Sequence, residues 1–192
     1  MSAAADTVAS MRHNPAMVDE ARPAETELGL LPQNGGWYVV NARETRWVGT
    51  DDMWRGAWIE PEEEWPALGF RLTVLDPGKP MARYHAESVQ EEFLIVEGEA
   101  TLLIEGEERP LRKWDFVHCP PWTEHVLVGA GDGPCVVAAV STREPGSEVR
   151  YVASELARKY GAAPEEDTSS PAEAYRGTSE PRLLRYRDGD LP

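Results

Sequence analysis

Between residues 70 and 140, short apolar runs alternate with turn signals along the chain. The runs that are typical of strands are FRLTVL, EEFLIV, ATLLI, HVLVG and CVVAAV. They are rich in β-branched and aromatic residues, and each is too short for a stable helix. Segments such as DPGKP, EGEE and GDGP place glycine, proline and acidic residues between them. Several short strands at this spacing predict an antiparallel sandwich or barrel, so we expect an all-β domain.

The flanking patterns divide the chain into three parts. Residues 1–36 are polar and rich in alanine, proline and glutamate, and we expect a flexible arm that orders only where it docks. Residues 37–146 are the predicted barrel domain. Residues 147–192 are predicted to contain one short helix, VASELARKY, ended by Gly161, and then an extended tail. The cluster LLRYR in this tail either docks on a neighbouring subunit or stays in solvent.

Composition and charge restrict the partners of the protein. Its 192 residues include 19 Lys and Arg against 34 Asp and Glu, which gives a formal net charge of −15. A field of this sign repels phosphate backbones and anionic membrane surfaces, so we expect neither nucleic acid nor membrane as a partner. No apolar run approaches the ~20 residues that span a bilayer, and the N-terminus lacks the pattern of a secretory signal. We therefore predict a cytoplasmic protein without a disulfide framework.

A set of histidines and glutamates has the spacing of a metal site. His85 and Glu87 are two residues apart, so on a strand both side chains project from the same face. A straight strand would carry Glu91 roughly 13 Å beyond Glu87. Residues 88–90 must therefore reverse the chain, so that Glu91 opens the returning strand and faces the first two ligands. His125 arrives from a later strand, which starts after a rigid diproline corner.

Two imidazoles and two carboxylates form a hard ligand set. This set favours one divalent transition metal, Mn, Fe or Ni, in octahedral geometry, with Zn less favoured. Four protein ligands would leave two positions for water, dioxygen or a chelating substrate. Glu91 is also the predicted catalytic residue, and either Glu91 or Glu87 is a general base if only three groups bind the metal. Glu92 replaces Glu91 as ligand if the turn is one residue longer.

Two motifs resemble those of the cupin family. The stretch YHAESVQEEFLIVEG (residues 84–98) is similar to the first cupin motif, and DFVHCPPWTEH (residues 115–125) is similar to the second. His85 matches the first histidine of the motif pair, Glu91 the metal-binding glutamate and His125 the final ligand. The resemblance implies a jelly-roll-like antiparallel β-barrel with an N-terminal arm, a short C-terminal helix and a tail. The chain is similar to single-domain bacterial cupins, a group with no settled activity.

The match continues beyond the ligands, with three departures. Gly98 takes the place of the hairpin glycine of the first motif, and Pro120 that of the motif proline of the second. Glu87 stands where the family usually has a second histidine. Trp114 and Trp122 replace glycines that usually open the second motif and form its turn.

Three further residues are predicted to contact the substrate. Arg83 shares the strand parity of His85 and should enter the same cavity, where it binds either a substrate carboxylate or phosphate, or a structural glutamate. Phe93 has the parity of Glu91 and should line the cavity above it. Cys119 is expected to face inward, as a metal ligand, as part of a thioether crosslink or as a small buried hydrophobe.

These features favour a metal-dependent enzyme that acts on a small organic substrate, which would be anionic if Arg83 contacts it. A dioxygenase is the first hypothesis, and an isomerase, epimerase or lyase the second. A barrel that binds a small molecule without turnover is the alternative, because the cupin fold hosts all of these functions. We also predict a homodimer, since exchange of arms or edge strands would cover exposed sheet edges.

Overall fold

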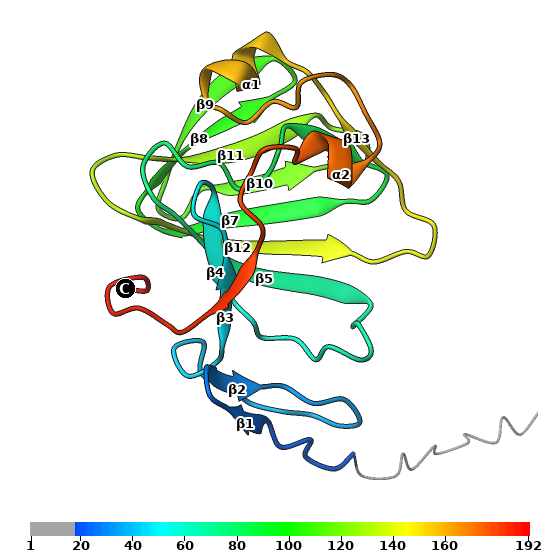
Figure 1. Cartoon of the computed structure of the whole chain (residues 1–192), viewed down its shortest axis with the longest axis vertical. Helices are drawn as coiled ribbons and strands as arrows, with labels where there is room; N and C mark the ends of the chain where they lie inside the picture. Colours follow the sequence, from blue (N-terminus) through cyan, green and yellow to red (C-terminus); the bar gives the residue numbers. More distant parts are fainter. Residues whose placement is uncertain (1–17) are drawn as a thin grey trace, which may run out of the picture.

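The computed structural model describes residues 18–192 and consists mainly of two β-sheets (Figure 1). The seven-stranded sheet has the order β10 (Phe116–Cys119), β7 (Glu91–Glu97), β12 (Cys135–Thr142), β5 (Leu68–Leu75), β4 (Trp54–Ala57), β3 (Trp47–Gly49) and β14 (Arg182–Leu184). The five-stranded sheet has the order β13 (Val149–Tyr151), β6 (His85–Glu87), β11 (His125–Ala130), β8 (Glu99–Ile104) and β9 (Glu107–Arg112).

Every pair of neighbouring strands in these two sheets is antiparallel. The all-β antiparallel prediction is therefore confirmed. Within residues 18–192 the two sheets share no strand, so the barrel is not closed by hydrogen bonds. The architecture is a jelly-roll-like sandwich rather than a continuous cylinder.

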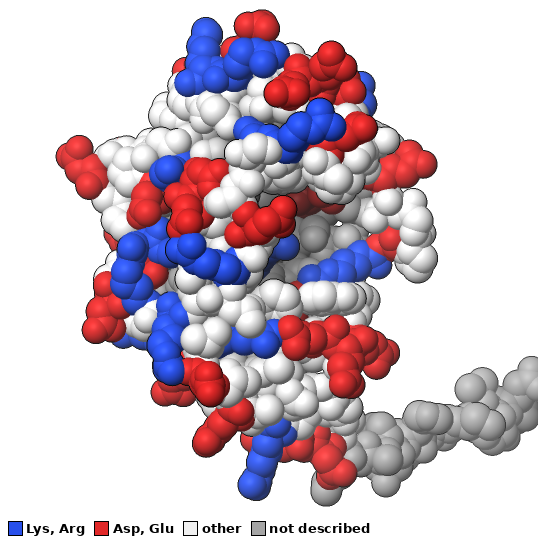
Figure 2. Space-filling view, viewed as in Figure 1, with Lys and Arg blue, Asp and Glu red and all other residues white. Residues whose placement is uncertain are grey.

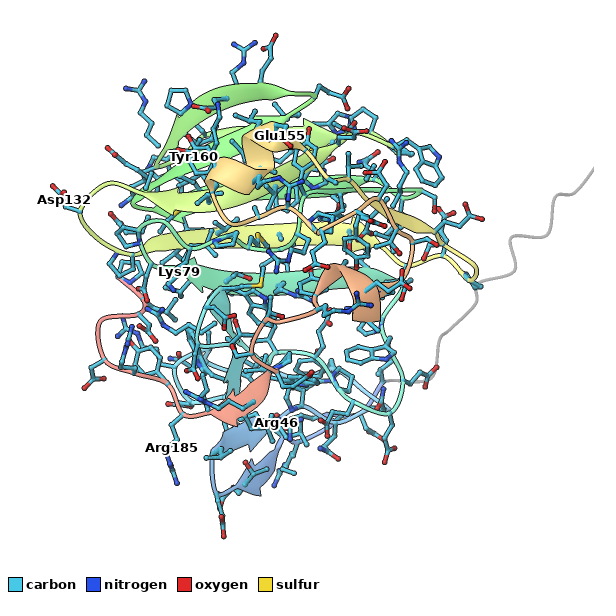
Figure 3. The ribbon with its side chains drawn as sticks, turned by 45° about the horizontal axis from the view of Figure 1, so that its top comes forward. Arg46, Lys79, Asp132, Glu155, Tyr160 and Arg185 are labelled. Carbon is cyan, nitrogen blue, oxygen red and sulfur yellow. The ribbon has the colours of Figure 1, made fainter. Side chains whose placement is uncertain are left out.

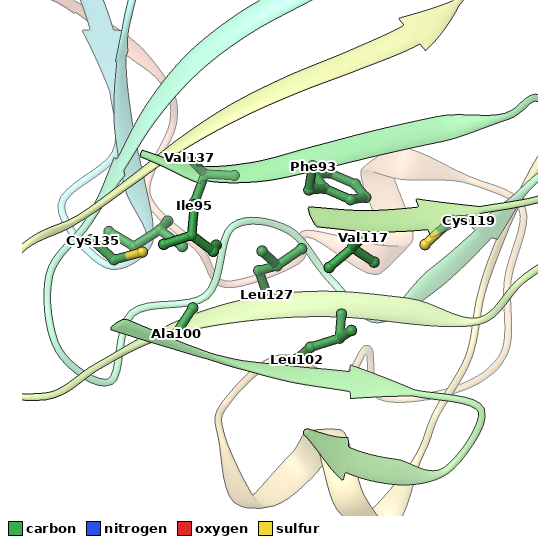
Figure 4. Close-up of a cluster of buried hydrophobic side chains, with 10 residues drawn as sticks. Phe93, Ile95, Ala100, Leu102, Val117, Cys119, Leu127, Cys135 and Val137 are labelled. Atoms are coloured by element: carbon green, nitrogen blue, oxygen red, sulfur yellow. The ribbon is translucent and has the colours of Figure 1, made fainter. Parts of the chain in front are cut away.

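A buried apolar cluster fills the space between the two sheets (Figure 4). Its members are Leu75, Phe93, Ile95, Ala100, Leu102, Val117, Cys119, Leu127, Cys135 and Val137. Strand β10 shows how the sequence pattern builds this core. Val117 and Cys119 are buried, whereas Phe116 and His118 between them are exposed. This period-two alternation directs one face of the strand into the core.

Turns at one end of the sandwich leave the other end free for the site. Lys79 and Asp132, labelled in Figure 3, mark the turns after β5 and β11, and both lie at the same side of the molecule. Gly78 donates a backbone hydrogen bond of 2.8 Å to Gly129, which joins these two segments. His125 begins β11 and therefore lies toward the opposite end.

The segments outside the sandwich contain more regular structure than the sequence predicts. Strands β1 (Ala24–Thr26) and β2 (Gly29–Leu31) form a hairpin within the predicted N-terminal arm. The arm prediction for residues 1–17 lies outside the described residues. The division of the chain at residues 36 and 146 stays a prediction.

The C-terminal part also differs from the prediction of one helix and an extended tail. It contains two short helices, α1 (Glu155–Lys159) and α2 (Pro171–Ala174). The tail then adds β14 to β3. Leu184 and Tyr186 of the LLRYR cluster pack on Trp47 of the same chain, so this cluster contributes to the fold of its own subunit. No helix in the described part of the chain has the length and apolar character to cross a membrane.

Candidate metal centre

Three of the predicted ligands meet at one end of the sandwich. His85 opens β6 and lies directly opposite His125, the first residue of β11. The centroids of the two imidazole rings are 4.9 Å apart. Glu91 opens β7 in the facing sheet, and one ligand atom from each of the three residues lies within 4.8 Å of the other two. The two sheets thus place nitrogen and oxygen donors around a common point.

Backbone carbonyls orient both imidazoles. The Nδ1 atom of His85 lies 2.7 Å from the carbonyl oxygen of Arg83, and Nδ1 of His125 lies 3.0 Å from that of Thr123. A carbonyl oxygen only accepts hydrogen bonds, so each Nδ1 carries the proton and donates it. The Nε2 atoms of both rings then face the centre. This arrangement is typical of metal-binding histidines.

The centre contains polar atoms that the protein itself does not satisfy. The Nε2 atom of His125 and the Oε2 atom of Glu91 are buried, and neither has a hydrogen-bond partner among the described residues. They lie 3.2 Å apart, and Nε2 of His85 is 3.8 Å from the same carboxylate oxygen. Buried polar atoms without partners are costly. A divalent cation would satisfy them, so the donor set fits a metal ion.

The negative charge of the Glu91 carboxylate also favours a cation. Burial by itself would raise the pKa of Glu91, but nearby His125, His85 and Arg71 hold it below its usual value. Burial would lower the pKa of His125, but the neighbouring Cys119 sulfur and Glu91 carboxylate raise it to about 10. Glu91 is therefore ionised at neutral pH and stabilises positive charge beside it.

Glu87 lies at the edge of this group. Its Oε1 atom is 3.4 Å from Nε2 of His85, but its carboxylate is not part of the mutual cluster. Its side chain is 32% exposed, against 15% for Glu91. The role of Glu87 as a fourth ligand stays a prediction. Glu92, the alternative to Glu91, hydrogen-bonds Gln90 and His118 instead.

A cavity of about 210 Å³ opens directly from the cluster. Glu87, Phe93 and the three cluster residues line it. Figure 2 shows a recess in the surface of the molecule, with charged side chains at its rim. The prediction for Phe93 agrees with its position, because its ring centroid is 5.3 Å from that of His125.

Two residues predicted to contact the substrate do not contribute to the lining of this cavity. Arg83 donates hydrogen bonds to the carbonyl oxygens of Ala174 and Gly161, at 3.1 and 2.6 Å. Strand β6 begins only at His85, so the strand parity assumed for Arg83 does not apply, and these contacts favour the structural alternative for this residue. Cys119 is buried in the apolar core, as expected for a small buried hydrophobe, and does not line the cavity.

The cavity lining includes cationic and phenolic residues that the sequence interpretation missed. Arg71 comes from β5 and Arg143 follows β12, while Tyr151 ends β13 and Tyr175 follows α2. Arg71 had a visible signal, because it is the one charged residue in the run FRLTVL. Tyr175 had no such signal in the sequence, because only the path of the C-terminal segment brings it to the site.

The two tryptophans that depart from the motif pattern occupy positions suited to glycine. Trp114 and Trp122 have φ angles of 75° and 67°, in the left-handed region that side chains rarely adopt. Trp122 donates its backbone N–H to the carbonyl of Glu87 at 2.6 Å. This bond ties the turn before β11 to the end of β6, and so helps to hold the two histidine strands in register.

The comparison with protein families agrees with this architecture. The family model for the cupin domain matches residues 71–142, which include all three residues of the cluster. Residues 71–142 therefore match the cupin domain family.

Curated relatives add a more specific likeness. A glucose-6-phosphate isomerase of Pyrococcus abyssi is 30% identical over 108 residues, which cover 50% of this chain and 57% of the relative. A glucose-6-phosphate isomerase of Thermococcus onnurineus is 29% identical over 103 residues, covering 47% and 54%. The chain thus spans little more than half the length of these relatives.

Solved structures with a similar fold include two proteins with lower identity. One is a sugar phosphate isomerase from a cupin superfamily of Silicibacter pomeroyi, with 20% identity, a TM-score of 0.48 and coverage of 73% of this chain and 81% of that one. The other is a Cupin 2 conserved barrel domain protein of Salinispora arenicola, with 24% identity, a TM-score of 0.44 and coverage of 50% and 81%. Likeness at this level does not extend to a shared substrate.

Proposed function

We propose that the protein is a divalent-metal-dependent isomerase that acts on a small anionic hydroxy-carbonyl compound such as a sugar phosphate. The observation that carries this proposal is the buried cluster of His85, Glu91 and His125, which opens into a cavity that Arg71 also lines. The likeness to isomerases over about half the chain supports the choice of reaction.

In this proposal His85, Glu91 and His125 hold the metal ion. A divalent ion bound there would act as a Lewis acid that polarises the carbonyl group of the substrate. The mixed nitrogen and oxygen donors suit Mn, Fe or Ni, with Zn less favoured, and the native metal stays a prediction. Glu91 then serves as a ligand rather than as the catalytic base.

Glu87 is the proposed general base. Isomerisation of a hydroxy-carbonyl compound moves a proton between two adjacent carbon atoms, so a carboxylate must reach the cavity without being committed to the metal. Glu87 lines the cavity, lies outside the mutual cluster and is the most exposed of the nearby carboxylates. These features support it over Glu91, whose carboxylate contacts both histidines.

Tyr175 is placed to act as a proton donor. Burial is the main reason why the pKa of its phenol lies above the usual value, so the hydroxyl stays protonated at neutral pH. Its oxygen accepts a hydrogen bond from the backbone N–H of Arg83 at 3.3 Å. The phenolic proton therefore remains available for a substrate oxygen in the cavity.

Arg71 takes the role that the sequence interpretation gave to Arg83. Its guanidinium lines the cavity and has no hydrogen bond or ion pair with any of residues 18–192. Arg143, the other cation in the lining, is already paired with Glu60 at 2.5 Å. An anionic group of the substrate is the natural partner for Arg71.

The dioxygenase hypothesis uses the same ligands, so the geometry alone does not separate it from an isomerase. The relatives named above favour isomerisation, and our proposal follows them. The small-molecule substrate, the homodimer and the cytoplasmic location also stay predictions.

Turnover in deuterated water tests the proposal. The purified protein, loaded in turn with Mn, Fe, Ni or Zn, is incubated with glucose 6-phosphate or fructose 6-phosphate and followed by NMR, while an oxygen electrode records uptake. We expect interconversion without oxygen consumption, and loss of both activity and bound metal in His85→Ala. Glu87→Gln should keep the metal and lose turnover, whereas Glu92→Gln on the same strand should keep both. Metal-dependent oxygen uptake, or no conversion of any anionic hydroxy-carbonyl compound tried, sugar phosphates included, would refute it.

A further inference from the structure

A second and larger cavity lies next to the first. Its volume is about 440 Å³, compared with about 210 Å³ for the cavity at the cluster. Phe70, Arg71 and Arg143 line both cavities, so the two spaces adjoin at these side chains. A substrate held at the cluster can therefore extend past Arg71 into additional space.

Three tryptophans line this second cavity, which we call the tryptophan chamber. Trp54, Trp58 and Trp65 contribute to its lining. The rings of Trp58 and Trp65 are 6.2 Å apart and tilted by 45°. Faces of this kind bind flat apolar or aromatic groups through a large contact area with little loss of side-chain entropy.

The junction between the two cavities is cationic. The guanidinium of Arg71 lies 5.4 Å from the ring centroid of Trp54, and that of Arg143 lies 4.9 Å from that of Trp65. These cation–π contacts hold both cations at the entrance to the chamber. Arg143 is paired with Glu60, while Arg71 has no such partner among residues 18–192, so a ligand anion is best placed at Arg71.

We infer that the tryptophan chamber binds an aromatic group of an elongated anionic substrate, with the acidic group at Arg71 and the hydroxy-carbonyl end at the metal centre. The assignment of the reacting end rests on the proposed function, whereas the binding of the aromatic group does not. A simple sugar phosphate would occupy the first cavity and leave the chamber unused. The substrate class is therefore an aryl or heteroaryl compound that carries a phosphate or carboxylate.

Binding of matched phosphate monoesters tests the inference without turnover. Isothermal titration of the metal-free protein compares 1-naphthyl phosphate with methyl phosphate, which has the same anion and no ring. We expect 1-naphthyl phosphate to bind at least tenfold more tightly. Trp65→Ala should reduce this preference to about threefold or less, and Arg71→Met should weaken the binding of both esters.

Two controls separate the chamber from general effects. Trp114→Ala removes an exposed tryptophan that lines neither cavity and should leave the preference unchanged. Trp65→Phe retains a flat ring and should keep most of the preference for 1-naphthyl phosphate. Equal affinity for the two esters, or an unchanged preference in Trp65→Ala, would overturn the inference even if sugar phosphates are isomerised. Tight naphthyl phosphate binding without any isomerisation would leave the chamber intact and refute only the proposed function.

Discussion

Asp190 anchors the C-terminal segment to the sandwich through a buried charge network. Its side chain is only 2% exposed, and its Oδ1 atom lies 2.6 Å from Arg55 and 2.8 Å from Arg187. Arg55 also pairs with Asp76 at 2.8 Å, and its own side chain is 13% exposed. Asp190→Ala would therefore remove one of the two carboxylates that neutralise a nearly buried guanidinium.

The expected loss follows from what remains around Arg55. Removing one partner of a buried ion pair costs about 3–5 kcal/mol when the other charge is left unpaired. Here Asp76 still contacts both terminal guanidinium nitrogens of Arg55, at 2.8 and 3.1 Å, so the positive charge keeps one partner. We therefore expect Asp190→Ala to lower the free energy of unfolding by about 2–3 kcal/mol.

Urea unfolding followed by tryptophan fluorescence measures this difference. Asp188→Ala is the matched control, because Asp188 is exposed in the same tail and should change the free energy of unfolding by less than about 0.5 kcal/mol. Asp190→Asn removes the charge and keeps the shape, so its loss in the free energy of unfolding should lie between those of the two alanine variants. A loss below about 0.5 kcal/mol for Asp190→Ala would show that this network does not stabilise the fold.

Three further predictions concern the metal centre, a hairpin and a buried thiol. Excess Mn at about 100 times its Kd should stabilise the metal-free protein by about 2.7 kcal/mol in a thermal scan, and His125→Ala should abolish the shift. Gly98→Ala should cost roughly 2–4 kcal/mol, because φ is 76° and a Cβ would lie 2.5 Å from the carbonyl oxygen of Pro134. Gly106→Ala, with φ of 77° and open space around it, should cost only about 1 kcal/mol, and equal losses would refute the clash. Burial raises the pKa of the Cys135 thiol from 9.0 to about 12, so the unfolded state ionises first and stability falls as pH rises above 9. Urea unfolding at pH 7 and pH 10.5 should therefore show about 2 kcal/mol more alkaline loss in the wild type than in Cys135→Ala, and parallel losses would contradict this.

The sequence was sufficient to predict the sandwich because its strands follow local rules. The pairing of β5 with β12 extends over the full length of FRLTVL and CVVAAV, and both runs are rich in β-branched or apolar residues. The hairpin between β7 and β8 turns at Gly98, whose positive φ suits a glycine. Strand β14 is short and depends on its pairing with β3, so no local pattern predicts it. Helix α2 has a local signal that the sequence interpretation missed, because Ser170 caps it and Pro171 opens it.

Local patterns also decide which residues of the site could be predicted. The sequence predicts that His85, Glu91 and His125 lie together because each stands at the start of a strand with a defined parity. The same parity argument failed for Arg83, which lies before β6 and turns toward the C-terminal segment. Arg71 could not be placed without the register of β5 against β12, which decides where its side chain lies relative to the centre.

The residues that line the two cavities fall partly inside and partly outside the region that matches the cupin model. The three cluster residues and Arg71 fall within the cupin match, at residues 71–142. The three tryptophans of the chamber precede this range, while Tyr175 and Pro181 follow it and are carried to the cavities by the C-terminal segment. The candidate metal ligands therefore lie in the region that matches the cupin model, and segments outside that region contribute other side chains that line the two cavities. Loosening those segments, as in Asp190→Ala, should consequently impair the binding of an aromatic ligand more than the binding of a metal ion.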